Sequence, residues 1–125
     1  MELGIKGLAE LLTTHEHSAS SAGSGALEVF STPSMIALME KAALDSVQPY
    51  LEEGHSTVGT RVEVSHLAAS PIGMTVRAES ELIEIDRKRL VFKVEAYAGD
   101  KLIGEGLHTR FIINAAKFMA KTEAK

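Results

Sequence analysis

The sequence contains 125 residues, of which 45% are hydrophobic and 24% are charged, and its formal net charge is −4. A chain of this length folds as one domain that buries about two-thirds of its unfolded surface, so we expect a single domain over residues 1–125. The negative charge and the scattered lysines and arginines argue against a nucleic-acid partner. The absence of cysteine excludes disulfides, thiolate catalysis and cysteine-ligated metal.

The hydropathy pattern gives no sign of a membrane-spanning segment. No apolar run approaches the ~18 residues that a transmembrane helix needs. The first residues also lack the charged-then-apolar pattern of a signal peptide. We therefore expect a cytoplasmic protein with no membrane partner.

The first 25 residues give weak structural signals. Residues 1–10 read as a lead-in or a short helical turn. Residues 11–19 alternate roughly in polarity, which favours a half-buried or edge strand. The segment SASSAGSG at residues 18–25 has little that can pack, and we expect a flexible loop there, a candidate lid over a site.

Residues 33–48 give the clearest element, a helix. Thr32 suits the N-cap, Pro33 suits the first helical position, and Pro49 cannot continue the helix. At roughly 100° per residue, one wide face is apolar. Its members are Met35, Ile36, Met39, Ala43, Leu44 and Val47. Glu40 falls within this apolar set, so its carboxylate needs a compensating partner.

Four strands joined by short connections follow the helix. Alternating polarity places them at residues 57–68, 74–85, 90–98 and 101–114, with a short charged tail after them. The order of one strand, a long helix and a four-strand antiparallel meander predicts an α+β fold in which the sheet wraps around the central helix. Unpaired edge strands in such a sheet favour a dimer.

We expect His66 and Glu40 to point into the same interior, because the apolar faces of the strand and the helix should meet. His66 shares its strand face with Val64 and Ala68. Pairing with Glu40 would satisfy both polar groups and would orient the imidazole as a general base. A core histidine bonded to a backbone carbonyl and a purely structural ion pair are the alternatives.

Thr32 and Gly59 each have a structural and a chemical interpretation. As an N-cap, Thr32 satisfies backbone N–H groups of the helix. The helix dipole favours developing negative charge at that position, so a hydroxyl with a base nearby could act as a nucleophile or orient a water. Gly59 could let a ligand carbonyl approach the backbone, or it could form a β-bulge.

No other motif points to a metal or a cofactor. His15, His17, His55 and His108 lack the spacing of a metal site. The sequence also lacks a glycine-rich phosphate loop, a G-x-S-x-G elbow and stacked aromatic residues for nucleic acid. We therefore expect no metal and no cofactor.

Three segments resemble the hotdog-fold acyl-CoA thioesterases, and among these the fluoroacetyl-CoA thioesterase type. They are VFSTPSMIALMEKAA, GTRVEVSHLAASPIGM and GEGLHTRFIIN. The resemblance extends from Val29 to Phe118. It implies a hotdog fold and a catalytic set formed by Thr32, Glu40 and His66, with Gly59 near the bound thioester.

The resemblance implies that an acyl-CoA is hydrolysed to the free acid and CoA, which is itself part of the substrate, by a homodimer or a dimer of dimers with sites near the subunit interface. His66 would activate water or assist the thiolate. Glu40 would act as a base or as a nucleophile, and Thr32 would position the carbonyl or supply its hydroxyl. The fluoroacetyl-specific enzymes carry a phenylalanine six residues before the threonine, where this chain has Ala26. We therefore expect a short or medium acyl group.

Two other functions fit the same fold. A hotdog enoyl thioester hydratase or dehydratase also uses a histidine and an acid on an acyl thioester. A non-catalytic acyl-CoA binding module would keep the fold without turnover. The fold alone does not distinguish a thioesterase from either of these alternatives.

Overall fold

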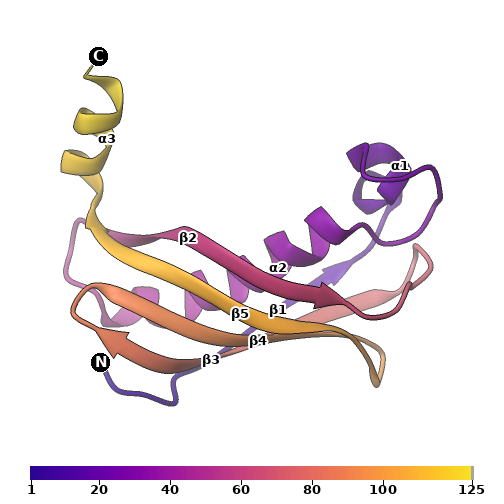
Figure 1. Cartoon of the computed structure of the whole chain (residues 1–125), viewed down its shortest axis with the longest axis horizontal. Helices are drawn as coiled ribbons and strands as arrows, with labels where there is room; N and C mark the ends of the chain where they lie inside the picture. The colour runs from indigo at the N-terminus through magenta and orange to yellow at the C-terminus, as the bar shows by residue number, and fades with distance from the viewer. Residues whose placement is uncertain (125) are drawn as a thin grey trace.

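Residues 1–124 are described by a computed structural model, in which one five-stranded antiparallel sheet curves around a long helix (Figure 1). The elements in chain order are β1 (Lys6–Leu12), η1 (His15–His17), α1 (Ala19–Ala22), α2 (Thr32–Val47), η2 (Gln48–Tyr50), β2 (His55–His66), β3 (Thr75–Asp86), β4 (Arg89–Ala98), β5 (Lys101–Asn114) and α3 (Ala115–Glu123). The expected α+β architecture, a sheet around a central helix, is confirmed.

The strand order is β1-β3-β4-β5-β2, and each neighbouring pair is antiparallel. The two hairpins β3–β4 and β4–β5 follow the predicted turns, with Arg87 and Gly99 at positive φ of 59° and 60°. The predicted four-strand meander is wrong for β2, which pairs with β5 rather than with β3. The reason is that β1 pairs with the other edge of β3. β2 therefore closes the opposite side of the sheet, and its outer edge has no strand partner among residues 1–124.

Helix α2 starts one residue before the predicted helix and gives way to a short 3-10 turn at Pro49. The predicted N-cap at Thr32 is wrong. Ser31 is the N-cap, and its buried hydroxyl accepts a hydrogen bond from the Ser34 N–H at 3.1 Å. Because Ser31 satisfies the helix start, the hydroxyl of Thr32 is available for another partner.

The buried face of α2 differs from the predicted apolar face. The helix buries Met35, Leu38, Met39, Ala42, Ala43 and Val47. Ile36, Glu40 and Leu44 lie one turn apart on a half-exposed flank beside this face, and the side chain of Glu40 is 39% exposed. Glu40 is therefore not a core residue, although it stands next to the core.

Two glycines let the sheet approach α2 closely. A Cβ at Gly7 would collide with the Ala42 carbonyl oxygen and with the Ser80 hydroxyl, and a Cβ at Gly104 would collide with the thioether of Met35. Because backbone cannot give way, Gly7 requires glycine, whereas a Cβ at Gly104 would force the buried Met35 side chain to move.

The N-terminal prediction is wrong in its placement of the first strand. Residues 1–10, expected as a lead-in, contain most of β1, whereas residues 13–19 leave the sheet and turn into η1. Residues 18–25, expected as a loop, include the short helix α1, which is capped by Ser18 and ends at Gly23 with φ of 73°. In Figure 1 this segment lies beyond the N-terminal end of α2.

Helix α3 stands away from the sheet at the end of β5 (Figure 1). It buries none of its residues and is capped by the Asn114 side chain, which accepts from the Lys117 N–H at 3.0 Å. Within residues 1–124 no helix, α3 included, is long and apolar enough to cross a membrane.

Candidate active site

Thr32 and His66 meet in a cleft at the N-terminal end of α2. The end of β2 supplies His66, and the Thr32 Oγ1 lies 2.8 Å from the His66 Nδ1, a hydrogen-bond distance. The cleft has a volume of about 310 Å³, and small side chains, Ala19 of α1 and Ser24, line its lid side. A hydroxyl in direct contact with an imidazole at an open cleft has the geometry that a nucleophile and its general base require.

The surroundings of His66 favour the neutral imidazole. Burial lowers the pKa of His66, and the nearby backbone of Ala68 opposes this only in part. Its Nε2 is buried and has no hydrogen-bond partner within residues 1–124. A neutral Nδ1 that faces a hydroxyl can accept its proton. The N-terminus of the 16-residue helix α2 beside Thr32 would also stabilise negative charge that develops on a bound carbonyl.

Glu40 does not join this pair, so the predicted pairing of Glu40 with His66 is wrong within one protomer. Thr32 and Glu40 are eight residues apart on α2, about 12 Å along the helix axis. The carboxylate instead faces β5, with Oε2 at 3.9 Å from both the His108 Nε2 and the Arg110 Nη1. Glu40 lies on the half-exposed flank of α2 rather than on its buried face, and the rise along the helix separates it from the Thr32–His66 pair.

His108 and Arg110 form a buried polar network beside Glu40. The Arg110 guanidinium donates to the Thr57 hydroxyl at 2.7 Å and to the Thr57 carbonyl at 2.8 Å. It also donates to the His108 Nε2 at 3.1 Å, and the His108 Nδ1 then donates to the Arg61 carbonyl at 2.8 Å. This arrangement requires neutral His108 with its proton on Nδ1, because arginine is only a donor.

The direction of the pKa shift of His108 agrees with a neutral imidazole. Burial lowers the pKa of His108, with Arg110 adding to the effect and Glu40 opposing it. Burial also lowers the pKa of Arg110, and the negative charge of Glu40 partly restores it. The guanidinium remains charged, is fixed in orientation by its hydrogen bonds, and presents its charge to Glu40.

Gly59 lies against this network. A shift in the β2–β5 register between Gly59 and Arg61 marks a bulge, which confirms the structural interpretation of this glycine. A Cβ at Gly59 would lie 2.8 Å from the Glu40 Oε2 and 3.1 Å from the His108 Cε1. The absence of a Cβ at Gly59 therefore leaves the space that the Glu40 carboxylate occupies.

His108 and Arg110 were not predicted as site residues from the sequence. The sequence does contain an indication of this pair. His108 and Arg110 are two residues apart on one strand, so both side chains point inward, and the neighbouring inward positions Gly106 and Ile112 are small or apolar. Such a pair on a buried face needs a shared hydrogen-bond network.

His15 and His17 lie in η1 rather than on a strand. The His15 Nδ1 pairs with Glu28 at 2.6 Å, and the Ser20 hydroxyl donates to the same carboxylate at 2.8 Å. These contacts tie α1 to the segment that leads into α2. Among residues 1–124 no group of three or more His, Cys, Asp or Glu side chains is arranged to hold a metal.

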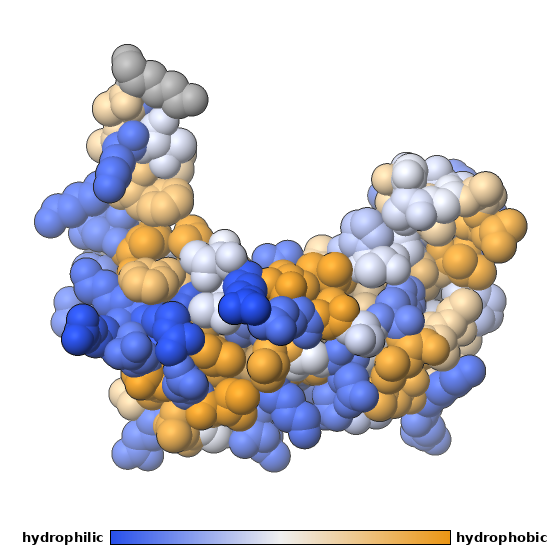
Figure 2. All heavy atoms as spheres, in the orientation of Figure 1, coloured by the Kyte–Doolittle hydropathy of each residue, from blue (hydrophilic) through white to orange (hydrophobic). Residues whose placement is uncertain are grey.

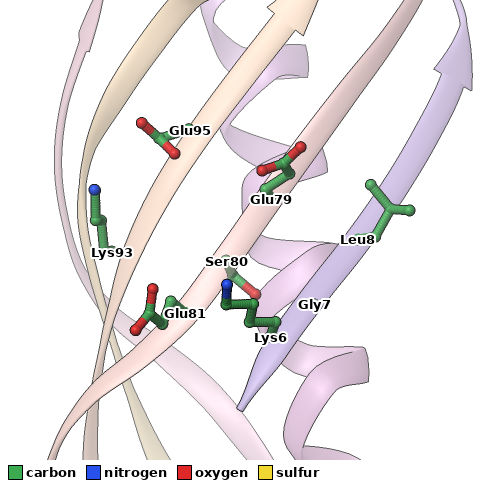
Figure 3. Close-up of a pocket in the computed structure, with 8 residues that line it drawn as sticks. All are labelled: Lys6, Gly7, Leu8, Glu79, Ser80, Glu81, Lys93 and Glu95. Atoms are coloured by element: carbon green, nitrogen blue, oxygen red, sulfur yellow. The ribbon is translucent and has the colours of Figure 1, made fainter. Parts of the chain in front are cut away.

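A second hollow, of about 270 Å³, lies over strands β1, β3 and β4 (Figure 3). Glu81 lies opposite both Lys6 and Lys93, whereas Glu79 and Glu95 lie opposite each other. This hollow has no nucleophile–base pair comparable to Thr32 and His66, so the cleft at α2 is the candidate active site.

Comparison with known proteins identifies the family of the chain. The family model described as fluoroacetyl-CoA-specific thioesterase matches residues 13–116. A fluoroacetyl-CoA thioesterase from Streptantibioticus cattleyicolor is 43% identical over 98 residues, which cover 78% of this chain and 70% of that protein.

Solved structures support the same family and show the same fold. A mutant of the fluoroacetyl-CoA enzyme in complex with acetyl-CoA superposes with a TM-score of 0.92 at 33% identity, covering 98% of this chain and 96% of that one. A hot-dog-like protein from Thermanaerovibrio acidaminovorans, 20% identical, superposes with a TM-score of 0.87 over 98% of this chain and 90% of that one, which supports the fold. The chain therefore belongs to the fluoroacetyl-CoA-specific thioesterase family and is a thioester hydrolase with the hotdog fold.

Proposed function

We propose that the protein hydrolyses a short or medium acyl-CoA to the free acid and CoA, with Thr32 and His66 as the reacting pair and with no metal or cofactor. The observation that carries the proposal is the 2.8 Å contact between the Thr32 Oγ1 and the His66 Nδ1 over the cleft. As the hydroxyl oxygen attacks the thioester carbon, its proton passes to Nδ1. The C–S bond then breaks, and the thiolate takes up this proton.

Water completes the reaction in the same geometry. His66, neutral again, withdraws a proton from a water that attacks the acyl-threonine, and the C–O bond to Thr32 breaks as Oγ1 recovers its proton. The N-terminus of α2 would stabilise the oxyanion in both steps.

We assign Glu40 to the same reaction through a homodimer. Glu40 lies about 12 Å along α2 from Thr32, too far to act on one thioester within a protomer. The outer edge of β2 has no strand partner within residues 1–124. Antiparallel pairing of two such edges, centred between residues 62 and 63, would place His66 opposite Gly59 of the partner subunit and hence near the Glu40 site.

The surface along β2 supports this assembly. Hydrophobic side chains lie on the floor of the hollow between α3 and α1 (Figure 2). Val62 is 39% exposed although it is on the inward face, and Leu67 is 51% exposed. A second copy seated in this hollow would cover apolar surface and complete the sheet. A dimer of dimers would add contacts without changing this site.

The small lid supports a substrate other than fluoroacetyl-CoA alone. Ala19 and Ser24 give the lid side of the cleft small side chains, and Val29, Phe30 and Leu67 line its other walls. A lid side without a bulky residue leaves room for added methylene groups, since the free energy of discrimination is then only about 1–3 kcal/mol per methylene.

The test is thiol release from a panel of acyl-CoAs, from short to long and including fluoroacetyl-CoA. Thr32→Val, His66→Ala and Glu40→Gln should each lower kcat by ~100-fold or more while the protein stays folded. Thr32→Ser, which keeps the hydroxyl, should retain much more activity than Thr32→Val. Activity that survives both Thr32→Val and His66→Ala would refute the proposed pair.

The dimer is tested separately. Val62→Lys should shift the mass measured by light scattering from dimer to monomer and should abolish thiol release, because the Glu40 half of the site would be lost. A wild-type protein that is monomeric and active would show that the assignment of Glu40 across an interface is wrong.

A further inference from the structure

Helix α3 adds nothing to the core. None of its residues is buried, and besides its N-cap it is held by the Ala115 N–H, which donates to the Gly54 carbonyl at 2.9 Å. Its apolar residues Phe118 and Met119 are 39% and 50% exposed. A helix that the fold does not require, yet which carries exposed aromatic and basic side chains, provides a binding surface.

A cavity of about 500 Å³ lies where α3 leaves β5. Phe111 and Phe118 line it together with Lys88, Lys117 and Lys121, and no carboxylate is among its lining residues. None of the three lysines forms an ion pair within residues 1–124. In a chain of net charge −4, this cavity is a local concentration of unneutralised positive charge beside aromatic rings.

This surface, the α3 patch, matches a phosphorylated nucleotide. Lysine ammonium groups bind phosphates as point charges, and purine bases stack on phenylalanine rings. The patch is also on the strands that carry the site: the pair Gly59–Arg110 and the pair His55–Asn114 belong to one β2–β5 register. Four residues separate them, about 13 Å along the strands, a gap that an extended linker must span.

We propose that the α3 patch, formed by Lys88, Lys117, Lys121, Phe111 and Phe118, binds the 3′-phosphoadenosine diphosphate part of CoA. The inference rests on the proposed function and adds a subsite to it. The lysines hold the phosphates, a phenylalanine ring takes the adenine, and the pantetheine arm runs along β2 and β5 towards Glu40 and Gly59. Nucleotide and thioester are thereby bound by separate parts of the chain.

The experiment compares one acyl group on CoA, on pantetheine and on a phosphopantetheine carrier protein. The variants are Phe118→Ala and the double substitution Lys117→Glu/Lys121→Glu. Lys101→Glu, at the far end of β5, is the charge control. The charge reversal should raise KM for the acyl-CoA at least tenfold and leave kcat unchanged. It should leave KM for acyl-pantetheine, which has no nucleotide, unchanged. Lys101→Glu should change neither value.

Three kinetic results would overturn the proposal. The first is an unchanged KM for acyl-CoA in the charge reversal, and the second is an equal rise for acyl-pantetheine. The third is a rise confined to the carrier-protein substrate, which would assign the patch to an acidic protein surface. Calorimetry with adenosine 3′,5′-bisphosphate separates this proposal from the proposed function. Binding to the wild type, lost in the double variant, would support the patch even if no thioester is hydrolysed, and absence of binding to the wild type would refute it.

Discussion

Replacing Gly59 by alanine tests whether open space beside β2 sets the position of Glu40. The added Cβ would lie 2.8 Å from the Glu40 Oε2, 3.1 Å from the His108 Cε1 and 3.4 Å from the Arg110 Nη1, where ordinary contacts begin at 3.4 Å. His108 and Arg110 are buried and hydrogen-bonded, so the carboxylate, at the end of a flexible side chain, moves. The distance from the Cβ to the Glu40 Oε2 is short of an ordinary contact by 3.4 minus 2.8, so the carboxylate shifts by about 0.6 Å. Misplacement of about 1 Å can cost 10²-fold in rate, so we expect kcat to fall by about 10-fold.

The stability of Gly59→Ala should change little. Gly59 is not among the residues with positive φ, so alanine adopts its backbone conformation without strain. Alanine has less conformational entropy than glycine in the unfolded chain, so the substitution stabilises a strand by about 0.5–1 kcal/mol. This gain offsets the crowding of His108. The assay is kcat from thiol release together with the free energy of unfolding from urea titration. Unchanged kcat in the folded variant would refute the reasoning.

A double-mutant cycle provides the control for this prediction. If Gly59→Ala acts by displacing the carboxylate, it should cost much less in kcat when added to Glu40→Gln than when added to the wild type. Equal losses in both backgrounds would show that Gly59 contributes in another way, such as by close approach of the substrate to its backbone.

Further predictions separate structure from chemistry at the other site residues. Ser31→Ala removes the N-cap of α2 and should lower the free energy of unfolding by about 1 kcal/mol, whereas Thr32→Val should change it by less than about 0.5 kcal/mol, as thermal unfolding by circular dichroism can check. Burial lowers the pKa of His66 and of His108 in the folded protein. The unfolded chain therefore binds protons first, and stability should be full near neutral pH and fall as pH drops from about 7 to about 5. His108→Gln, which keeps an acceptor for Arg110, should flatten this dependence in urea titrations at several pH values. An unchanged slope would show that His108 is not the titrating group.

The sequence contained enough local information for α2 and for the strands after it. Pro33 and Pro49 bracket the helix, and alternating polarity marks each strand because one face is buried. β1 was misplaced because KGLAELL carries leucines at helical spacing, at residues 8, 11 and 12. That segment becomes a strand through pairing with β3, about 70 residues away in the chain, a contact that local pattern does not contain.

The sequence predicted some residues of the candidate site but not how they are paired. Thr32 and His66 were singled out from position and face, and the structure brings them together. The partner of Glu40 was assigned wrongly, since matching two buried faces says nothing about distance along the helix. His108 and Arg110 were missed, because their importance comes from hydrogen bonds between β2 and β5 that form only in the folded sheet.

The eight-residue separation of Thr32 and Glu40 also constrains how this enzyme can evolve. Both groups are carried by one uninterrupted helix, so a single inserted or deleted residue between them would turn Glu40 by about 100° and at the same time pull Met39 and Ala43 out of register with the sheet. The spacing of Thr32 and Glu40 and the packing of α2 would be lost together. In the segment over the cleft, residues 18–26, only Ser18 and Ala19 are buried. The length and bulk of its other residues can therefore change while Thr32 and Glu40 keep their places.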